Sequence, residues 1–111
     1  LEALAKKDVG AALVVLRETA KGSTDMHLFS TLLLEYLRTV LLIRHAPELH
    51  EELQGELGAE MYGELSELAG GTGSLTHSTL ALLLDAHAKI KYSPVPQLPL
   101  ELALYQLAEQ S

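Results

Sequence analysis

The stretch 26–43 limits what this chain can fold into more than any other part of the sequence. It contains no Gly or Pro and only two charged residues, Glu35 and Arg38. Several of its apolar residues fall at the spacing of one helical face; these are Leu28, Leu32, Leu33, Tyr36, Leu37, Val40 and Leu41. Further apolar residues widen the surface beyond that face, namely Phe29, Leu34, Leu42 and Ile43. A helix that is apolar on nearly all sides must be covered on nearly all sides. The stretch therefore predicts a buried central helix in a small all-helical bundle, with one side available to another subunit.

A membrane span is the rival explanation for an apolar stretch of this length. Glu35 and Arg38 lie in its middle, together with the polar residues Thr31 and Thr39. Because a central charge costs about 2.5 to 3.5 kcal/mol on membrane insertion, these residues argue against a span. The chain also lacks cysteine and any signal-peptide pattern, which favours a reducing compartment. We therefore expect a cytoplasmic chain with no membrane contact.

The rest of the chain is also typical of an all-α protein. Leu, Ala and Glu are abundant while aromatic residues make up 5% of the chain, and this composition favours helix over sheet. With short connections between helices, the sequence predicts a compact bundle of six to seven antiparallel helices. A length of 111 residues suits one domain. Because residues 1–6 resemble the interior of a helix, we expect residues 1–111 to be a single domain cut from a longer subunit.

Local signals place the helix boundaries. Asp8 is a predicted N-cap, and one of the residues 23–25 is expected to cap the central helix. Pro47 ends that helix near residue 45 and starts a short new one, which Gly55 and Gly58 are expected to interrupt. The predicted helices cover residues 8–21, 25–45, 48–54, 60–69 and 76–92, followed by a last helix from about residue 99.

The charge of the chain argues against direct nucleic-acid binding. Its net charge is −7, and its eight Lys and Arg residues are scattered along the sequence. A protein that neutralises the phosphates of DNA or RNA needs clustered basic residues. We therefore expect partners other than nucleic acid.

The sequence offers little for catalysis, cofactor binding or metal binding. It has no phosphate-binding loop and no cysteine nucleophile, and the glycine-rich segment 70–73 is interpreted as a linker. His45 and His50 flank an acidic segment that would suit a metal ion, but Gln54 stands where a second histidine ligand of the helix would be needed. The sequence therefore predicts no catalytic residue, no cofactor and no metal ligand, and we expect that this chain is not itself an enzyme.

His87 supports an alternative function as a phosphotransfer helical bundle. Such bundles present an exposed histidine with a lysine a turn or less away, and Lys89 follows His87 closely. However, His87 shares a predicted face with Leu80, Leu83 and Leu84. A half-buried packing histidine is the commoner outcome at such a position.

Surplus leucine on the last helix indicates a protein interface. The predicted inward face of that helix consists of Leu100, Ala103, Leu104 and Leu107, so Leu98, Leu102 and Tyr105 lie away from it. Excess apolar surface of this kind marks interaction sites. We expect the candidate interface to include Leu34, Leu98, Leu102, Tyr105 and Gln106.

Three stretches, in order and at the expected spacing, resemble one known family. Residues 1–13 read Leu-x-x-Leu-Ala-x-Lys-Asp-Val-Gly-Ala-Ala-Leu, and residues 28–42 read Leu-Phe-x-x-Leu-Leu-x-x-Tyr-Leu-Arg-x-x-Leu-Leu. The most specific stretch is residues 91–104, Lys-Tyr-Ser-Pro-Val-Pro-Gln-Leu-Pro-Leu-Glu-Leu-Ala-Leu. Together they resemble the third domain of the bacterial DNA polymerase III gamma/tau subunit, the collar of the clamp loader.

This resemblance implies an oligomerisation domain without catalysis of its own. In the family, two upstream domains bind and hydrolyse ATP, and the third domain packs beside its counterparts into a collar. The collar holds the subunits together while the sliding clamp is loaded onto DNA during replication. The implied partners are the other clamp-loader subunits, which are gamma/tau copies, delta and delta-prime.

Overall fold

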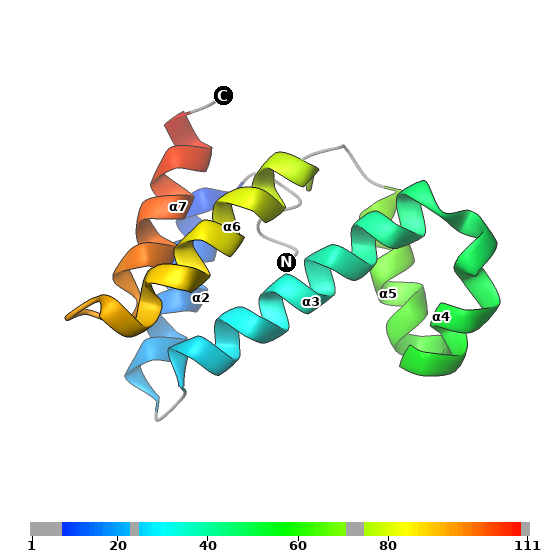
Figure 1. The fold of residues 1–111 in the computed structure, drawn as a ribbon, viewed down its shortest axis with the longest axis horizontal. Coiled ribbons are helices and arrows are strands. Elements are labelled where there is room, and N and C mark those ends of the chain that lie inside the picture. Colours follow the sequence, from blue (N-terminus) through cyan, green and yellow to red (C-terminus); the bar gives the residue numbers. More distant parts are fainter. Residues whose placement is uncertain (1–7, 23–24, 71–74, 110–111) are drawn as a thin grey trace.

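The computed structural model describes residues 8–22, 25–70 and 75–109, and over these ranges the chain is helical without any strand (Figure 1). The α-helices are α2 (Val9–Lys21), α3 (Met26–His45), α4 (His50–Leu57), α5 (Ala59–Ala69), α6 (His77–Lys89) and α7 (Leu98–Glu109). Two 3-10 turns, η1 (Pro47–Leu49) and η2 (Ile90–Tyr92), precede α4 and follow α6. The prediction of an all-α bundle with six to seven helices is confirmed.

Three of the helices start at side-chain caps. The Asp8 carboxylate accepts a hydrogen bond from the backbone N–H of Ala11 at 3.0 Å, and Asp25 accepts one from His27 at 2.8 Å. Thr76 and Thr79 form a reciprocal capping box at the start of α6. These caps satisfy backbone N–H groups that have no partner within the helix. The predicted caps Asp8, Asp25 and Thr76 are therefore confirmed, while the alternatives at residues 23, 24 and 74 lie outside the described residues.

The break between α4 and α5 falls at Gly58 rather than at Gly55. Helix α4 continues through Gly55 to Leu57, so the prediction of a helix ending at residue 54 is wrong. A glycine inside a helix costs only about 1 kcal/mol, which the surrounding packing can offset. Gly58 instead has φ 89° and ψ 153°, a backbone conformation that is essentially restricted to glycine.

Helix α3 lies at the centre of the arrangement (Figure 1). It packs against α6 toward its start and against α5 toward its end. On one side of the molecule α7 packs between α6 and α2, and on the other side α4 covers α5. The result is an elongated body with principal extents of 42, 31 and 21 Å.

Arg44 joins the end of α3 to two other parts of the chain. Its Nε donates a hydrogen bond to the carbonyl oxygen of Ala69, the last residue of α5, at 3.0 Å. A terminal guanidinium nitrogen donates to the carbonyl oxygen of Leu75, just before α6. Because the guanidinium is charged, these bonds are stronger than neutral ones. Arg44 therefore fixes α5 and the entry to α6 relative to α3.

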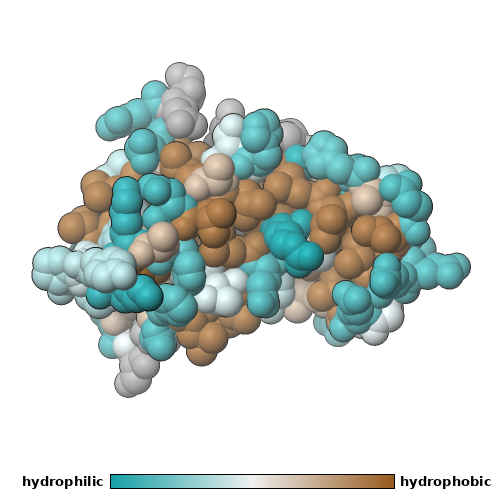
Figure 2. All heavy atoms as spheres, viewed as in Figure 1, coloured by the Kyte–Doolittle hydropathy of each residue, from teal (hydrophilic) through white to brown (hydrophobic). Residues whose placement is uncertain are grey.

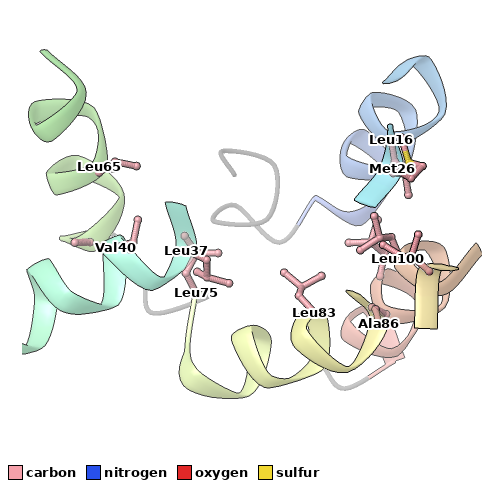
Figure 3. Packing of buried hydrophobic residues seen from close by; sticks show 13 residues of the cluster. Leu16, Met26, Leu37, Val40, Leu65, Leu75, Leu83, Ala86 and Leu100 are labelled. Carbon is pink, nitrogen blue, oxygen red and sulfur yellow. The ribbon is translucent and has the colours of Figure 1, made fainter. Parts of the chain in front are cut away.

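The buried side chains form one continuous core along the long axis. Figure 3 shows Leu65 and Val40 where α5 meets α3, Leu37 and Leu75 beside them, and Leu83 further along α6. The core continues through Ala86 and Leu100 between α6 and α7, and it reaches Leu16 and Met26 at the far end. Among the described α-helices, all but α4 contribute a buried residue to this cluster, and Leu57 of α4 packs against it.

The buried side of α3 differs from the predicted face in its first half. Leu37 and Val40 are fully buried as predicted, but Leu28 is 55% exposed and Leu32 is 42% exposed. Ser30, which the apolar pattern did not mark, is fully buried. The prediction that α3 is covered on nearly all sides is therefore wrong within this chain. By length and composition alone α3 could cross a membrane, and only 28% of its apolar stretch is buried.

Candidate subunit interface

Helix α7 has one side in the core and one side at the surface. Leu100, Ala103 and Leu104 are at most 5% exposed, which confirms the predicted inward face. On the other side Leu98 is 38% and Leu102 is 52% exposed. Helix α7 carries more apolar side chains than its contacts with α2 and α6 cover. Its surplus leucines therefore remain available to another molecule.

A groove between α6 and α7 brings three of the candidate interface residues together. Leu98, Leu102 and Gln106 line this groove, which has a volume of about 330 Å³. Helix α6 and the following turn supply the opposite wall, with Leu82, Asp85, Ala86, Lys89 and Tyr92. We call this the α6–α7 groove. It is an open apolar furrow rather than an enclosed pocket suited to a small molecule.

The rim of the α6–α7 groove is polar. The Lys89 ammonium lies 2.9 Å from the Asp85 carboxylate, and both side chains are largely exposed. Tyr92 is 79% exposed, with the Lys91 ammonium 5.6 Å from the centre of its ring. An apolar centre with aromatic and charged groups at its edge is the composition of protein–protein interfaces.

Tyr105 lies in a different groove, between α2 and α7. This second groove has a volume of about 460 Å³ and is lined by Leu13, Arg17, Ala20, Lys21, Gln97, Glu101 and Tyr105. The Tyr105 hydroxyl donates a long hydrogen bond, 3.4 Å, to the Glu101 carboxylate one turn earlier. We call it the α2–α7 groove. The structure thus divides the residues expected on α7 between two surfaces.

Leu34 is not brought together with the residues of α7. It lies on α3, is half-buried and packs against the hydrophobic core. Leu34 therefore contributes to the fold of this chain, and its place in an interface stays a prediction.

The exposure of several further apolar residues was not predicted from the sequence. Val14 and Val15 on α2 are 61% and 55% exposed, and Leu84 on α6 is 57% exposed. Val14 and Val15 lie off the helical stripe of buried residues in α2, a signal that could have identified them. Figure 2 shows hydrophobic residues gathered in a band across the face formed by α3 and α6.

His87 is a half-buried packing histidine. Its Nδ1 lies 3.0 Å from the hydroxyl oxygen of Ser30, and its ring centroid lies 4.4 Å from that of His27 at a tilt of 41°. Burial, and secondarily the nearby His27, lower the pKa of His87 below its ordinary value of 6.5. Lys89 pairs with Asp85 instead of flanking the imidazole. A phosphoacceptor histidine needs an accessible nitrogen with a cation beside it, so this geometry does not favour the phosphotransfer alternative.

The histidines near α4 do not converge on a common point. The Nδ1 of His50 lies 2.8 Å from the Tyr62 hydroxyl of α5, so this histidine joins the two helices. Within residues 8–22, 25–70 and 75–109, no three His, Asp or Glu side chains are grouped so that they could hold a metal ion.

Comparison with known proteins places the whole chain in one family. The family model described as DNA polymerase III subunits gamma and tau domain III matches residues 1–111. No curated protein and no solved structure matches the chain.

Proposed function

The chain belongs to the family of domain III of the DNA polymerase III subunits gamma and tau, and we propose that it acts as a collar domain of the clamp loader. In this role it holds clamp-loader subunits together while the sliding clamp is loaded onto DNA. It carries no chemistry itself and works in the cytoplasm as one domain of a longer subunit. Its partners are further gamma/tau copies, delta and delta-prime.

The exposed apolar side of α7 is the observation that carries this proposal. Leu98 and Leu102 remain 38% and 52% exposed although Leu100 and Leu104, on the same helix, complete the core. Leaving such residues in water has a cost that burial against a partner would remove, at about 25 cal/mol for each Å² of apolar surface. An assembly domain needs such surfaces, whereas a solitary bundle gains nothing from them.

The size of the domain also suits side-by-side packing. A stable interface buries about 800 Å² on each partner, while the whole described chain has an accessible surface of 6898 Å². Two such interfaces on different sides would use only a modest part of this surface. Contacts between unlike sides of neighbouring copies generate rings or open arcs.

The acidic chain fits a scaffolding role better than direct contact with DNA. Its net charge of −7 would repel the phosphate backbone. In the proposed assembly, the contacts with DNA and ATP belong to other domains of the subunits.

The test is association with intact clamp-loader subunits, measured by sizing and light scattering. We expect the chain to join the complex and the variant Leu102→Glu to lose this association, because a carboxylate would be buried in the apolar centre of the interface. Leu84→Glu is the matched control, since Leu84 is similarly exposed on α6 but does not line the α6–α7 groove. Circular dichroism of each variant establishes that it is folded.

Two results would contradict the proposed interface. Wild-type association by a folded Leu102→Glu variant would show that the α6–α7 groove is not the contact surface. Unfolding of Leu102→Glu in isolation would show that Leu102 belongs to the core.

A further inference from the structure

The negative charge of the chain is concentrated at one place. Seven glutamates lie between residues 48 and 67 without any Lys or Arg among them, and the other eight acidic residues balance the eight basic ones. The net charge of −7 therefore resides on η1, α4 and α5. All seven glutamates are exposed, and none forms an ion pair with any described residue. They are Glu48, Glu51, Glu52, Glu56, Glu60, Glu64 and Glu67. We call η1, α4 and α5 the acidic hairpin.

The α2–α7 groove lies at the other end of the molecule. Figure 1 shows α2 and α7 at one end of the longest axis and α4 and α5 at the opposite end. That axis measures 42 Å. The acidic hairpin therefore cannot reach the α2–α7 groove of its own chain, but both are available to neighbouring molecules at the same time.

The α2–α7 groove combines basic and apolar side chains. Arg17 is exposed and has no hydrogen bond or ion pair within the described part of the chain. Among residues 8–22, 25–70 and 75–109, the one ion pair of Lys21 is a long contact, 3.9 Å, with the exposed Glu18. Leu13, Ala20 and Tyr105 supply apolar surface between them, and Glu101, which accepts from Tyr105, is the acidic residue of the lining. This is a surface for a partner that carries several carboxylates and some apolar contact area.

We propose that the α2–α7 groove receives the acidic hairpin of a second copy of this chain. The inference rests on the proposed collar function and adds to it by assigning two complementary surfaces to a contact between like copies. The contact is head-to-tail, because it joins opposite ends of two molecules. Such heterologous contacts extend to a ring or an open arc. The hairpin carboxylates, which repel one another in the separate chain, meet Arg17 and Lys21 in the assembly.

The charges act mainly through orientation and the rate of encounter. Complementary potentials steer two surfaces into register and increase the association rate at low salt. The affinity itself comes from the apolar surface that becomes buried, here around Leu13 and Tyr105. The association should therefore weaken as the salt concentration rises.

The experiment is a charge swap on the 111-residue chain, with self-association measured by sedimentation equilibrium at low and high salt. The first variant, Arg17→Glu with Lys21→Glu, reverses the charge of the α2–α7 groove. The second variant, Glu56→Lys with Glu64→Lys, reverses two charges of the acidic hairpin. We expect each variant alone to associate at least about tenfold more weakly than wild type, since attraction is replaced by repulsion. A mixture of the two variants should recover association, because the reversed groove then faces the reversed hairpin. Arg38→Glu is the matched control, as this exposed arginine of α3 lines neither the α2–α7 groove nor the α6–α7 groove.

The outcomes separate this inference from the collar function. Wild-type behaviour of the groove variant, or no recovery in the mixture, would overturn the assignment of the two surfaces. A wild-type chain that stays monomeric at millimolar concentration and low salt would overturn the second copy as the occupant. Either result leaves the collar function to be judged by association with the clamp-loader subunits and its loss in Leu102→Glu.

Discussion

His87 of α6 and Ser30 of α3 form a polar contact where these two helices pack together. The imidazole Nδ1 and the serine hydroxyl oxygen are 3.0 Å apart, and Ser30 is fully buried. A buried hydroxyl without a partner would be costly. The contact therefore explains why α3 turns a serine toward α6.

Stability should fall as the pH drops below 6.5. The pKa of His87 is lowered from 6.5 in the folded chain, so the unfolded chain binds more protons in this range. The contribution of His87 is fully present above pH 6.5 and is lost as the pH falls toward the lowered pKa. The ring of His27 contacts that of His87, while the Asp85 and Lys89 side chains of α6 pair with each other. Urea unfolding of wild type and His87→Gln over a pH series measures the difference, and an acid-stabilised wild type would contradict the assignment.

Ser30→Ala should destabilise the fold by roughly 1 to 2 kcal/mol, because it leaves the partly buried imidazole without its partner. The control is Ser78→Ala on the exposed side of the first turn of α6, which should change the free energy of unfolding by less than about 0.5 kcal/mol. Chemical unfolding measures both. Equal effects of the two substitutions would show that the contact with His87 contributes nothing to stability.

Two adjacent leucines of α6 should differ sharply in their contribution to stability. Leu83 is 1% exposed whereas Leu84 is 57% exposed. Leu83→Ala removes core contacts and leaves a cavity, so we expect a loss of about 2 to 5 kcal/mol. Leu84→Ala should cost less than about 0.5 kcal/mol beyond the change in helix propensity. Thermal and urea unfolding of the two variants test this, and similar losses would place Leu84 in the core.

Two glycine substitutions near the α4–α5 connection should change the free energy of unfolding in opposite directions. Gly58→Ala forces a side chain into the glycine-only backbone region, which should cost about 1 to 3 kcal/mol. Gly63→Ala, in a helical position of α5 with open space around it, should stabilise the fold by about 0.4 to 1 kcal/mol. The comparison of unfolding midpoints is decisive, since loss of stability in both variants would show that α5 is not a regular helix at Gly63.

Removal of the Arg44 guanidinium should loosen the attachment of α5. Arg44→Met keeps much of the side-chain volume but leaves the carbonyl oxygens of Ala69 and Leu75 without their donor. We expect a loss of about 2 kcal/mol and faster hydrogen exchange at the end of α5. Arg38→Met is the control, because Arg38 is exposed on the same helix and has no partner within the described residues. Exchange rates that do not change in Arg44→Met would contradict this role.

The helix boundaries could be predicted because their signals are local. Asp8, Asp25 and Thr76 cap the helices that follow them, and Pro47 separates α3 from η1. Each of these effects depends on a few neighbouring residues, so the sequence pattern is sufficient to locate it. Gly55 was misleading because packing, which is not local, offsets the weak helix propensity of one glycine.

The orientation of α3 could not be predicted in the same way. When leucines occupy nearly every side of a helix, periodicity no longer distinguishes the buried face. The deciding residue was Ser30, whose burial depends on His87, 57 positions later in the chain. For the candidate interface, the sequence located the exposed leucines of α7. It could not assign Tyr105 to a separate groove, since that division depends on the packing of α2 beside α7.

Helix α3 is one unbroken segment of 20 residues, a length of about 30 Å, and Arg44 clips its far end to α5. It therefore acts as a stiff strut between the two halves of the molecule. Because no loop interrupts α3, a displacement of α4 and α5 is transmitted to α6 and α7. If copies associated head to tail, the position in which one copy binds would determine the orientation of the next copy.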